Sequence, residues 1–262
     1  MRDDANRPPL RVEGLAVGYV RHRRPRPVLE GIETVLRRGE LVCFLGPNGA
    51  GKSTLLRTLA GMQPPLAGRV VVAGEDLREL GPRRLARHLA VVLTDRIVVE
   101  ALTATALVEL GRYPYTGWSG RLAAADHAIV QRSLAAVGAQ DLAGRSVAEL
   151  SDGERQKVMI ARALAQEPEV LLLDEVTAFL DLPHRVEVLR ILRRLAHDEG
   201  KAVLLSTHDL ELALRNADRL WLLPKGGPLV AGGAGELIES GVFERTFGSA
   251  VAEMVALPGR VS

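Results

Sequence analysis

The chain has 262 residues, of which 47% are hydrophobic and 25% charged, a composition typical of a folded globular protein. Its formal net charge of +2 is too small to indicate nucleic-acid binding, and the single cysteine, Cys43, excludes an internal disulfide. No run reaches the roughly 18 apolar residues of a membrane-spanning helix, and Met1–Asp4 lacks the apolar core of a secretion signal, so we expect a cytoplasmic protein.

The first elements are predicted to be β-strands. Hydrophobic patterning favours strands over Leu10–Val20, Val28–Leu36 and Glu40–Leu45, with Cys43 as a small buried packing residue. The basic run Arg21–Pro27 contains two prolines and no aromatic residue. It is therefore predicted to be a solvated loop between two strands, and a contact with a phosphate or lipid headgroup is left open.

A complete phosphate-binding loop of the pattern G-x-x-x-x-G-K-[ST] follows the third strand and leads into the helix-favouring segment Ser53–Leu59. The loop consists of Gly46, Pro47, Asn48, Gly49, Ala50, Gly51, Lys52, Ser53 and Thr54. Glycines let backbone N–H groups approach phosphate oxygens at a helix N-terminus. Lys52 is predicted to reach the β- and γ-phosphates, and the Ser53 hydroxyl to ligate Mg²⁺. The chain is therefore predicted to bind a nucleoside triphosphate.

The middle of the chain changes from mixed to helical character. We predict a β segment over Gly68–Gly74, a helix over Pro82–His88 and a strand over Leu89–Leu93. Residues 98–165 are rich in Ala, Leu, Glu and Arg, which favours helices. The predicted helices are Thr103–Gly111, Ala123–Val137 and Asp152–Ala165, with a turn-rich loop over Arg112–Gly120.

Strands and helices alternate again towards the C-terminus. The predicted order is strand Val170–Leu173, helix His184–Asp198, strand Ala202–Ser206, helix Leu210–Asn216 and strand Arg219–Leu223. This alternation indicates right-handed β-α-β crossovers and a parallel sheet. We expect one domain over residues 1–262, in which a helical subdomain (98–165) is inserted into a nucleotide-binding α/β core (1–97 and 166–262).

Two acidic residues, Asp174 and Glu175, follow the apolar strand Val170–Leu173. Ligands bind at the carboxyl edge of a parallel sheet, so Asp174 is placed to hold Mg²⁺ and Glu175 to polarise an attacking water. Alone, the pair would be read as ordinary surface acids. The neighbouring phosphate loop makes that alternative the minor one.

Ser151 and Gly153 begin the predicted helix Asp152–Ala165. A hydroxyl and free N–H groups at a helix N-terminus can bind an anion. Ser151 also has the pattern of an N-cap with Glu154 as its capping-box partner. Both interpretations can hold together.

The segment Leu150–Gln156, named here the signature segment, resembles the signature sequence of ATP-binding cassette (ABC) ATPases, and other family elements follow the same order. Tyr19 resembles the aromatic residue that stacks on adenine, although it can also be a half-buried strand tyrosine. Leu180-Asp181 resembles the D-loop, and His208 resembles the switch histidine that senses the γ-phosphate. The resemblance implies an ABC ATPase fold: a P-loop NTPase core with an N-terminal antiparallel β subdomain and an inserted helical subdomain.

The resemblance also implies a mechanism. Two copies would pack head to tail as a homodimer, so that ATP lies between Lys52 of one copy and Ser151 and Gly153 of the other. Glu175, His208 and Lys52 would be the catalytic residues, and Asp181 would lie at the dimer interface. Asp95 aligns with the family's usual glutamine and is a candidate Mg²⁺ ligand, whose contact with the ion is left open as direct, water-mediated or absent. Asp152 replaces a frequent glycine. We expect an active ATPase.

The chain resembles the ATPase subunits of importers for iron–siderophores, haem and cobalamin. This resemblance is carried by Gly111–Trp118, Asp126 and the form of the signature segment. That resemblance implies polytopic permease partners, an extracytoplasmic substrate-binding protein and a peripheral position on the cytoplasmic face of the inner membrane. The permeases and the binding protein, not the ATPase, contact the cargo in such systems. The alternatives are an ATPase of another ABC transporter, importer or exporter, and a soluble ABC ATPase acting on ribosomes or DNA.

Overall fold

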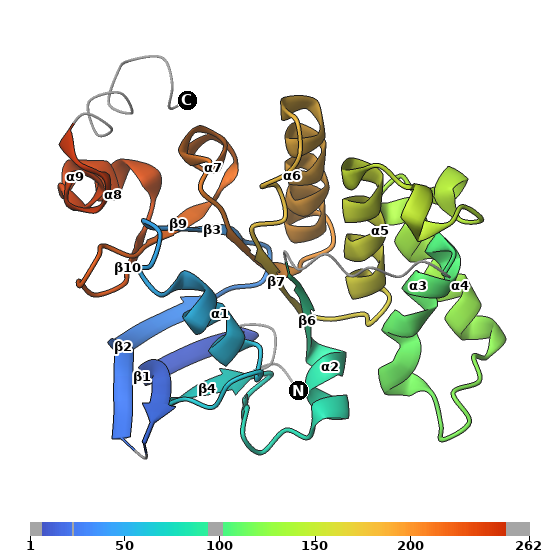
Figure 1. Cartoon of the computed structure of the whole chain (residues 1–262), viewed down its shortest axis with the longest axis horizontal. Coiled ribbons are helices and arrows are strands. Elements are labelled where there is room, and N and C mark those ends of the chain that lie inside the picture. The colour runs from blue at the N-terminus through green and yellow to red at the C-terminus, as the bar shows by residue number, and fades with distance from the viewer. Residues whose placement is uncertain (1–6, 23, 94–101, 250–262) are drawn as a thin grey trace.

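The computed structural model describes residues 7–22, 24–93 and 102–249, and Asp95 lies outside these residues. A six-stranded sheet forms the centre of the molecule (Figure 1). Its order is β10 (Val230–Gly232), β9 (Arg219–Leu222), β3 (Leu41–Leu45), β8 (Ala202–Ser206), β7 (Val170–Asp174) and β6 (Leu89–Val92). All neighbours pair in parallel except the edge strand β10, so the predicted parallel sheet is confirmed.

Both faces of the parallel sheet are buried, as continuous apolar strands require. In β3, Leu41, Cys43 and Leu45 belong to one hydrophobic core, whereas Val42 and Phe44 belong to the other. The alternation follows from the two-residue repeat of a strand. The first core also contains α6 (Leu182–His197) and α7 (Leu210–Asn216), which cover one face of the sheet (Figure 1).

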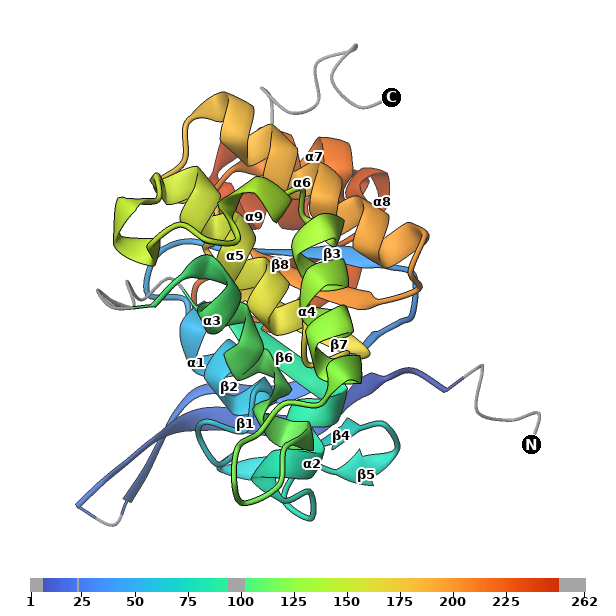
Figure 2. The same cartoon turned by 90° about the vertical axis from the view of Figure 1, so that its right-hand side faces the viewer.

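A four-stranded antiparallel sheet packs on the second core with α1 (Lys52–Leu59). Its order is β2 (Arg24–Leu36), β1 (Leu10–Arg21), β4 (Ala67–Val72) and β5 (Glu75–Asp76). The prediction of a loop over Arg21–Pro27 was wrong. β1 extends to Arg21 and β2 begins at Arg24, so that these two residues pair in a projecting hairpin (Figure 2). β2 tolerates its prolines because it is an edge strand.

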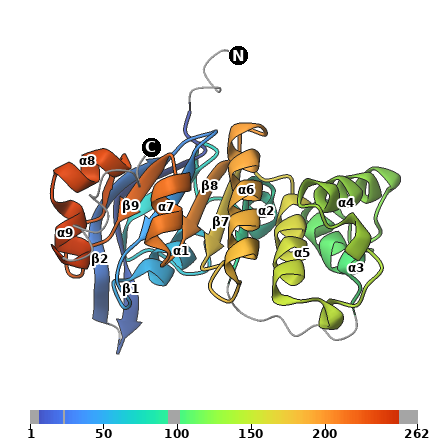
Figure 3. The ribbon, with the colours of Figure 1, turned by 90° about the horizontal axis from the view of Figure 1, so that it is seen from above.

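The remaining helices fall into two groups. The helices α2 (Pro82–His88), α8 (Ala234–Glu239) and α9 (Val242–Phe247) lie beside the two sheets. The sequence patterns do not predict β5, β10, α8 or α9. A separate helical layer stands at one end of the parallel sheet (Figure 3). It contains α3 (Ala104–Glu109), η2 (Leu110–Tyr115), α4 (Ala124–Ala136), η3 (Gln140–Leu142), η4 (Val147–Glu149) and α5 (Asp152–Leu164). The predicted loop at Arg112 is the 3₁₀ helix η2 as far as Tyr115.

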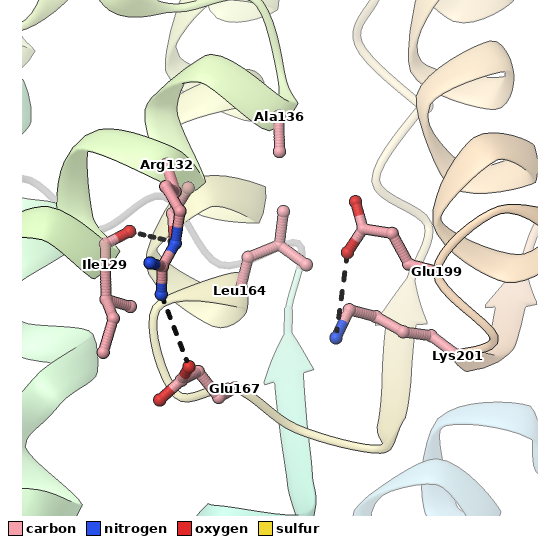
Figure 4. Close-up of a pocket in the computed structure, with 8 residues that line it drawn as sticks. Ile129, Arg132, Ala136, Leu164, Glu167, Glu199 and Lys201 are labelled. Carbon is pink, nitrogen blue, oxygen red and sulfur yellow. Dashed lines mark hydrogen bonds and ion pairs between the residues drawn. The ribbon is translucent and has the colours of Figure 1, made fainter.

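A cleft of about 350 Å³ lies between α4, the end of α5 and the turn that joins α6 to β8 (Figure 4). Arg132 of α4 faces Glu167 at 3.8 Å on one wall, and Glu199 faces Lys201 at 4.0 Å on the other. Each wall of the cleft thus carries an ion pair. None of the helices in the described part of the chain has the length and apolar character needed to span a bilayer.

Candidate active site

The phosphate loop connects β3 to α1 and folds closely against its surroundings. Gly49 and Gly51 have φ angles of +75° and +108°, a region that other residues rarely adopt. A Cβ atom at Gly46 would lie 2.7 Å from the Leu223 carbonyl oxygen, and one at Gly51 would lie 2.8 Å from Val28 Cγ1. Glycine is therefore required at these positions for conformation and for packing. The first N–H groups of α1 are left available at the loop.

Lys52 is only 6% exposed and lies inside the loop that it follows. Its Nζ donates hydrogen bonds to the carbonyl oxygens of Gly46 at 2.7 Å and Pro47 at 3.3 Å. Burial lowers the pKa of Lys52, while the carboxylates of Glu175 and Asp174 oppose this shift. The ammonium group is thus held between the loop and two acids, at a place where phosphate oxygens would be strong partners.

Asp174 ends β7 directly beside Ser206, the last residue of β8. Burial raises the pKa of Asp174, whereas the neighbouring hydroxyl groups of Ser206 and Ser53 and the charge of Lys52 lower it; the nearby Glu175 carboxylate raises it further. A buried carboxylate that meets the Ser53 hydroxyl is the kind of oxygen donor set that suits Mg²⁺. The described residues contain no cluster of three or more His, Cys, Asp or Glu side chains able to hold a metal. A Mg²⁺ ion here would therefore need phosphate and water oxygens to complete its coordination.

Glu175 and His208 meet at the same edge of the sheet. His208 follows β8, and its Nε2 lies 2.5 Å from Glu175 Oε1. Glu175 has a left-handed backbone conformation (φ +50°), and its N–H donates to the Ser206 carbonyl oxygen at 3.0 Å. Both side chains line a cleft of about 550 Å³ that also contains Arg185 and Asp209. A carboxylate here can act as a base towards a water molecule.

Tyr19 lies near the end of β1 and is 50% exposed. Its hydroxyl group is 3.0 Å from Thr54 Oγ1, in the first turn of α1. The aromatic ring is therefore adjacent to the phosphate loop, with an open face that a purine base can stack on.

Within one chain, the signature segment lies apart from the phosphate loop and from the residues Asp174, Glu175 and His208. Ser151 and Glu154 form the predicted capping box, with Ser151 Oγ accepting from the Glu154 N–H at 3.3 Å and Glu154 Oε2 accepting from the Ser151 N–H at 2.8 Å. The Glu154 carboxylate accepts hydrogen bonds from both the N–H and the hydroxyl group of Ser151, and these two bonds lower the pKa of Glu154. In the described residues, Ser151 makes no hydrogen bond to the phosphate loop. The parallel sheet separates α5 from α1 (Figures 1 and 3).

Asp181 caps α6 and is exposed to solvent. Its Oδ1 accepts hydrogen bonds from the N–H of His184 at 3.1 Å and from the His184 ring, and these bonds lower the pKa of Asp181. Sequence reasoning did not single out His184 or Arg185. The spacing of Asp181 and His184 at a helix start, with Arg185 next to it, is the signal that could have indicated both.

Comparison with known proteins gives a family. The model described as "ABC transporter" matches residues 29–178, more than half of the chain. An uncharacterized ABC transporter ATP-binding protein of Methanocaldococcus jannaschii is 48% identical over 82% of this chain and 72% of its own length. The achromobactin transport ATP-binding protein of Dickeya dadantii is 38% identical over 89% and 85%. The cobalamin import ATP-binding protein of Halobacterium salinarum is 42% identical over 86% of this chain and 56% of its own length.

Solved structures agree with this family in fold. A transporter ascribed to the metal-chelate type, in an inward-facing conformation, superposes with a TM-score of 0.79 at 27% identity, over 92% of this chain and 89% of the other. A dimeric cassette with bound ADP and phosphate, in a post-hydrolysis state, gives a TM-score of 0.73 at 25% identity, over 86% and 98%. The chain therefore belongs to the ABC transporter family, as one of its ATP-binding, ATP-hydrolysing subunits.

Proposed function

We propose that this chain is the ATPase subunit of a membrane importer for iron chelates, such as ferric siderophores, ferric citrate or haem, or for cobalamin. The observation that carries this proposal is the convergence of the phosphate loop, Asp174, Glu175 and His208 at one edge of the sheet. The names of the relatives support the cargo, since they include achromobactin transport and cobalamin import.

In the proposed reaction, Lys52 and the N–H groups of the phosphate loop bind the phosphates of ATP, and Tyr19 stacks on the base. Ser53 and Asp174 would hold Mg²⁺, with Asp95 as a further candidate outside the described residues. When bound, Mg²⁺ neutralises charge on the β- and γ-phosphates. Glu175 orients and polarises the attacking water, and His208 holds the Glu175 carboxylate and contacts the γ-phosphate.

The second half of each nucleotide site is proposed to come from another copy of the chain. Ser151 and Gly153 would approach the γ-phosphate bound by the mate's loop, and Asp181 would lie at the interface. The separation of α5 from α1 by the parallel sheet supports this arrangement, because Ser151 caps α5 and the phosphate loop leads into α1. ATP would then favour the closed dimer, and hydrolysis would release it.

The proposed partners are a pair of polytopic permeases, at the cytoplasmic face of the inner membrane, and indirectly an extracytoplasmic substrate-binding protein. Trp118 is 99% exposed and Tyr113 is 62% exposed, both on the helical layer, which is unusual for large aromatic residues. These side chains are suited to contact a permease. An ATPase of a different ABC transporter is the second candidate.

The test is a pull-down with tagged Glu175→Gln protein from detergent-solubilised membranes, followed by mass spectrometry. A protein with many membrane spans in stoichiometric amount is the expected result, and its binding-protein partner can then be titrated with ferric chelates, haem and cobalamin. Recovery of ribosomal proteins or nucleic acid in its place would refute the importer and favour a soluble ABC ATPase.

A further inference from the structure

The first turn of α6 brings the D-loop into contact with the signature segment. α5 and α6 stand side by side (Figures 1 and 3). His184 lies in this turn, three residues after Asp181. Its backbone N–H and its ring Nδ1 both bond to the same oxygen of Asp181, Oδ1. The ring is therefore fixed in orientation by the D-loop carboxylate.

The opposite edge of the His184 ring packs on Gly153. A Cβ atom at Gly153 would lie 2.5 Å from His184 Cδ2 and 3.1 Å from Nε2, so the imidazole occupies the space of the missing side chain. Gly153 is buried and is the second residue of α5. The ring thus supports the helix turn that carries the first N–H groups of the signature segment.

The turn that carries His184 is itself attached to the other side of the site. Arg185 Nε donates to the Leu180 carbonyl oxygen at 2.7 Å, and its other end lies 3.3 Å from Asp209 Oδ2, next to His208. One turn further along both helices, Lys157 of α5 and Glu187 of α6 form an ion pair at 2.5 Å. These bonds leave His184 little freedom to move independently of the D-loop.

We propose that His184 is a positioning residue through which Asp181 sets the location of Ser151 and Gly153 for catalysis. The proposal rests on the role of the signature segment in the proposed function. His184 touches neither nucleotide nor water in this account. Its loss should therefore slow turnover while leaving the affinity of the phosphate loop for ATP unchanged.

Three substitutions separate the contacts of the ring. His184→Ala removes the packing and the bond, and should lower kcat by about tenfold or more, because small displacements of catalytic groups are costly. His184→Asn retains a donor at the position of Nδ1 and atoms near Cδ2, and should recover most of kcat. His184→Gln places its amide near Nε2, and should recover less than His184→Asn. The dissociation constant for ATP should stay within about twofold in all three, since the loop is untouched.

His197→Ala is the matched control, because His197 lies on the same helix and also bonds to an aspartate, Asp218, at 2.9 Å. A kcat for His184→Ala within twofold of this control would overturn the proposal. Equal losses in His184→Asn and His184→Gln would also overturn it, since the bond to Asp181 would then be irrelevant. Ser151→Arg tests the role of the signature segment separately from the role of His184. If Ser151→Arg leaves turnover intact, the proposed role of the signature segment is wrong. If Ser151→Arg abolishes turnover while His184→Ala remains active, only the proposed role of His184 is refuted.

Discussion

Glu175 has the most unusual backbone of the catalytic cluster. A left-handed conformation is uncommon for residues other than glycine and costs about 1–3 kcal/mol when the surroundings enforce it. Its φ of +50° turns the chain directly after β7, while its N–H keeps a hydrogen bond to Ser206 in the adjacent strand. The turn directs the Glu175 carboxylate to His208. The strain thus places a base at the open edge of the sheet.

Glu175→Gln should stop turnover and spare ATP binding. The amide cannot accept a proton, so kcat should fall by about 10²-fold or more. Glutamine has nearly the same shape, and Lys52 and the loop N–H groups are unchanged. Equilibrium binding of ATP and single-turnover hydrolysis measure the two effects separately. Loss of ATP affinity in this variant would contradict a role for Glu175 confined to the water.

Lys52→Ala should weaken ATP binding itself. The variant removes a buried cation that lies at the phosphate-binding loop, and a hydrogen bond to a charged group contributes about 1.5–3 kcal/mol. The dissociation constant for ATP should therefore rise by about 10- to 100-fold. Adenosine, which has no phosphates, serves as the control ligand and should bind wild type and variant equally. An unchanged affinity for ATP would refute the phosphate-loop assignment of Lys52.

Asp174→Asn should stabilise the nucleotide-free protein while it abolishes Mg²⁺-dependent turnover. The pKa of Asp174 is raised mainly by burial, so its ionised form costs folding free energy at pH values above that raised pKa. Removing the charge should raise Tm at neutral pH by about 2–4 °C for each kcal/mol recovered. The gain should shrink as the pH falls through the raised pKa, because the wild-type carboxyl group then becomes neutral. A variant less stable than wild type at neutral pH would show that the ionised carboxylate is well paired.

At the scale of elements, Arg112 of η2 ties the helical layer together. Its side chain is only 5% exposed and forms ion pairs with Asp126 of α4 at 2.9 Å and Glu167 at 2.9 Å. It also donates to the Ala165 carbonyl oxygen after α5 at 2.7 Å. Arg112→Ala would remove a buried cation from the Asp126 carboxylate, which is 15% exposed, and from the Ala165 carbonyl oxygen, so the free energy of unfolding should fall by about 3–5 kcal/mol.

Urea unfolding of Arg112→Ala measures this loss, and Arg132→Ala provides the control. Arg132 faces the same Glu167 but is 69% exposed and 3.8 Å away, so its removal should cost less than about 1 kcal/mol. Similar losses for the two variants would mean that burial does not govern the strength of this network.

The elements that the sequence predicts best are those that bury a face. Val170–Leu173 and Ala202–Ser206 were predicted as strands of a parallel sheet, and both lie inside the sheet with every apolar side chain covered. The charge and prolines of Arg21–Pro27 suggested a loop, but pairing extends β1 to Arg21 and begins β2 at Arg24. Short elements such as β10 and α8 depend on tertiary contacts and carry too few residues for a periodic pattern.

In the candidate site, too, features with a sequence pattern could be predicted and contacts without one could not. Sequence motifs predicted the phosphate loop, Asp174 and Glu175, and the family resemblance indicated His208. In the structure these residues are neighbours at the sheet edge. It did not predict the contact of His184 with Gly153, because that contact joins two helices whose separation in the sequence carries no pattern.

At the scale of the whole molecule, the halves of the proposed nucleotide site lie on different parts of one chain. The phosphate loop belongs to the core between the two sheets, and Ser151 begins a helix of the layer beyond β7 (Figure 3). A second copy would bring the two halves together.

The central claim is that ATP is bound between two copies, through the loop of one and the signature segment of the other. Light scattering after gel filtration of Glu175→Gln protein, with ATP and Mg²⁺, tests it most directly. The account predicts a dimer with ATP, a monomer with ADP, and a monomer that still binds ATP when Ser151→Arg is added to Glu175→Gln. An ATP-dependent dimer that survives Ser151→Arg, or no dimer of Glu175→Gln at saturating ATP, would contradict the account.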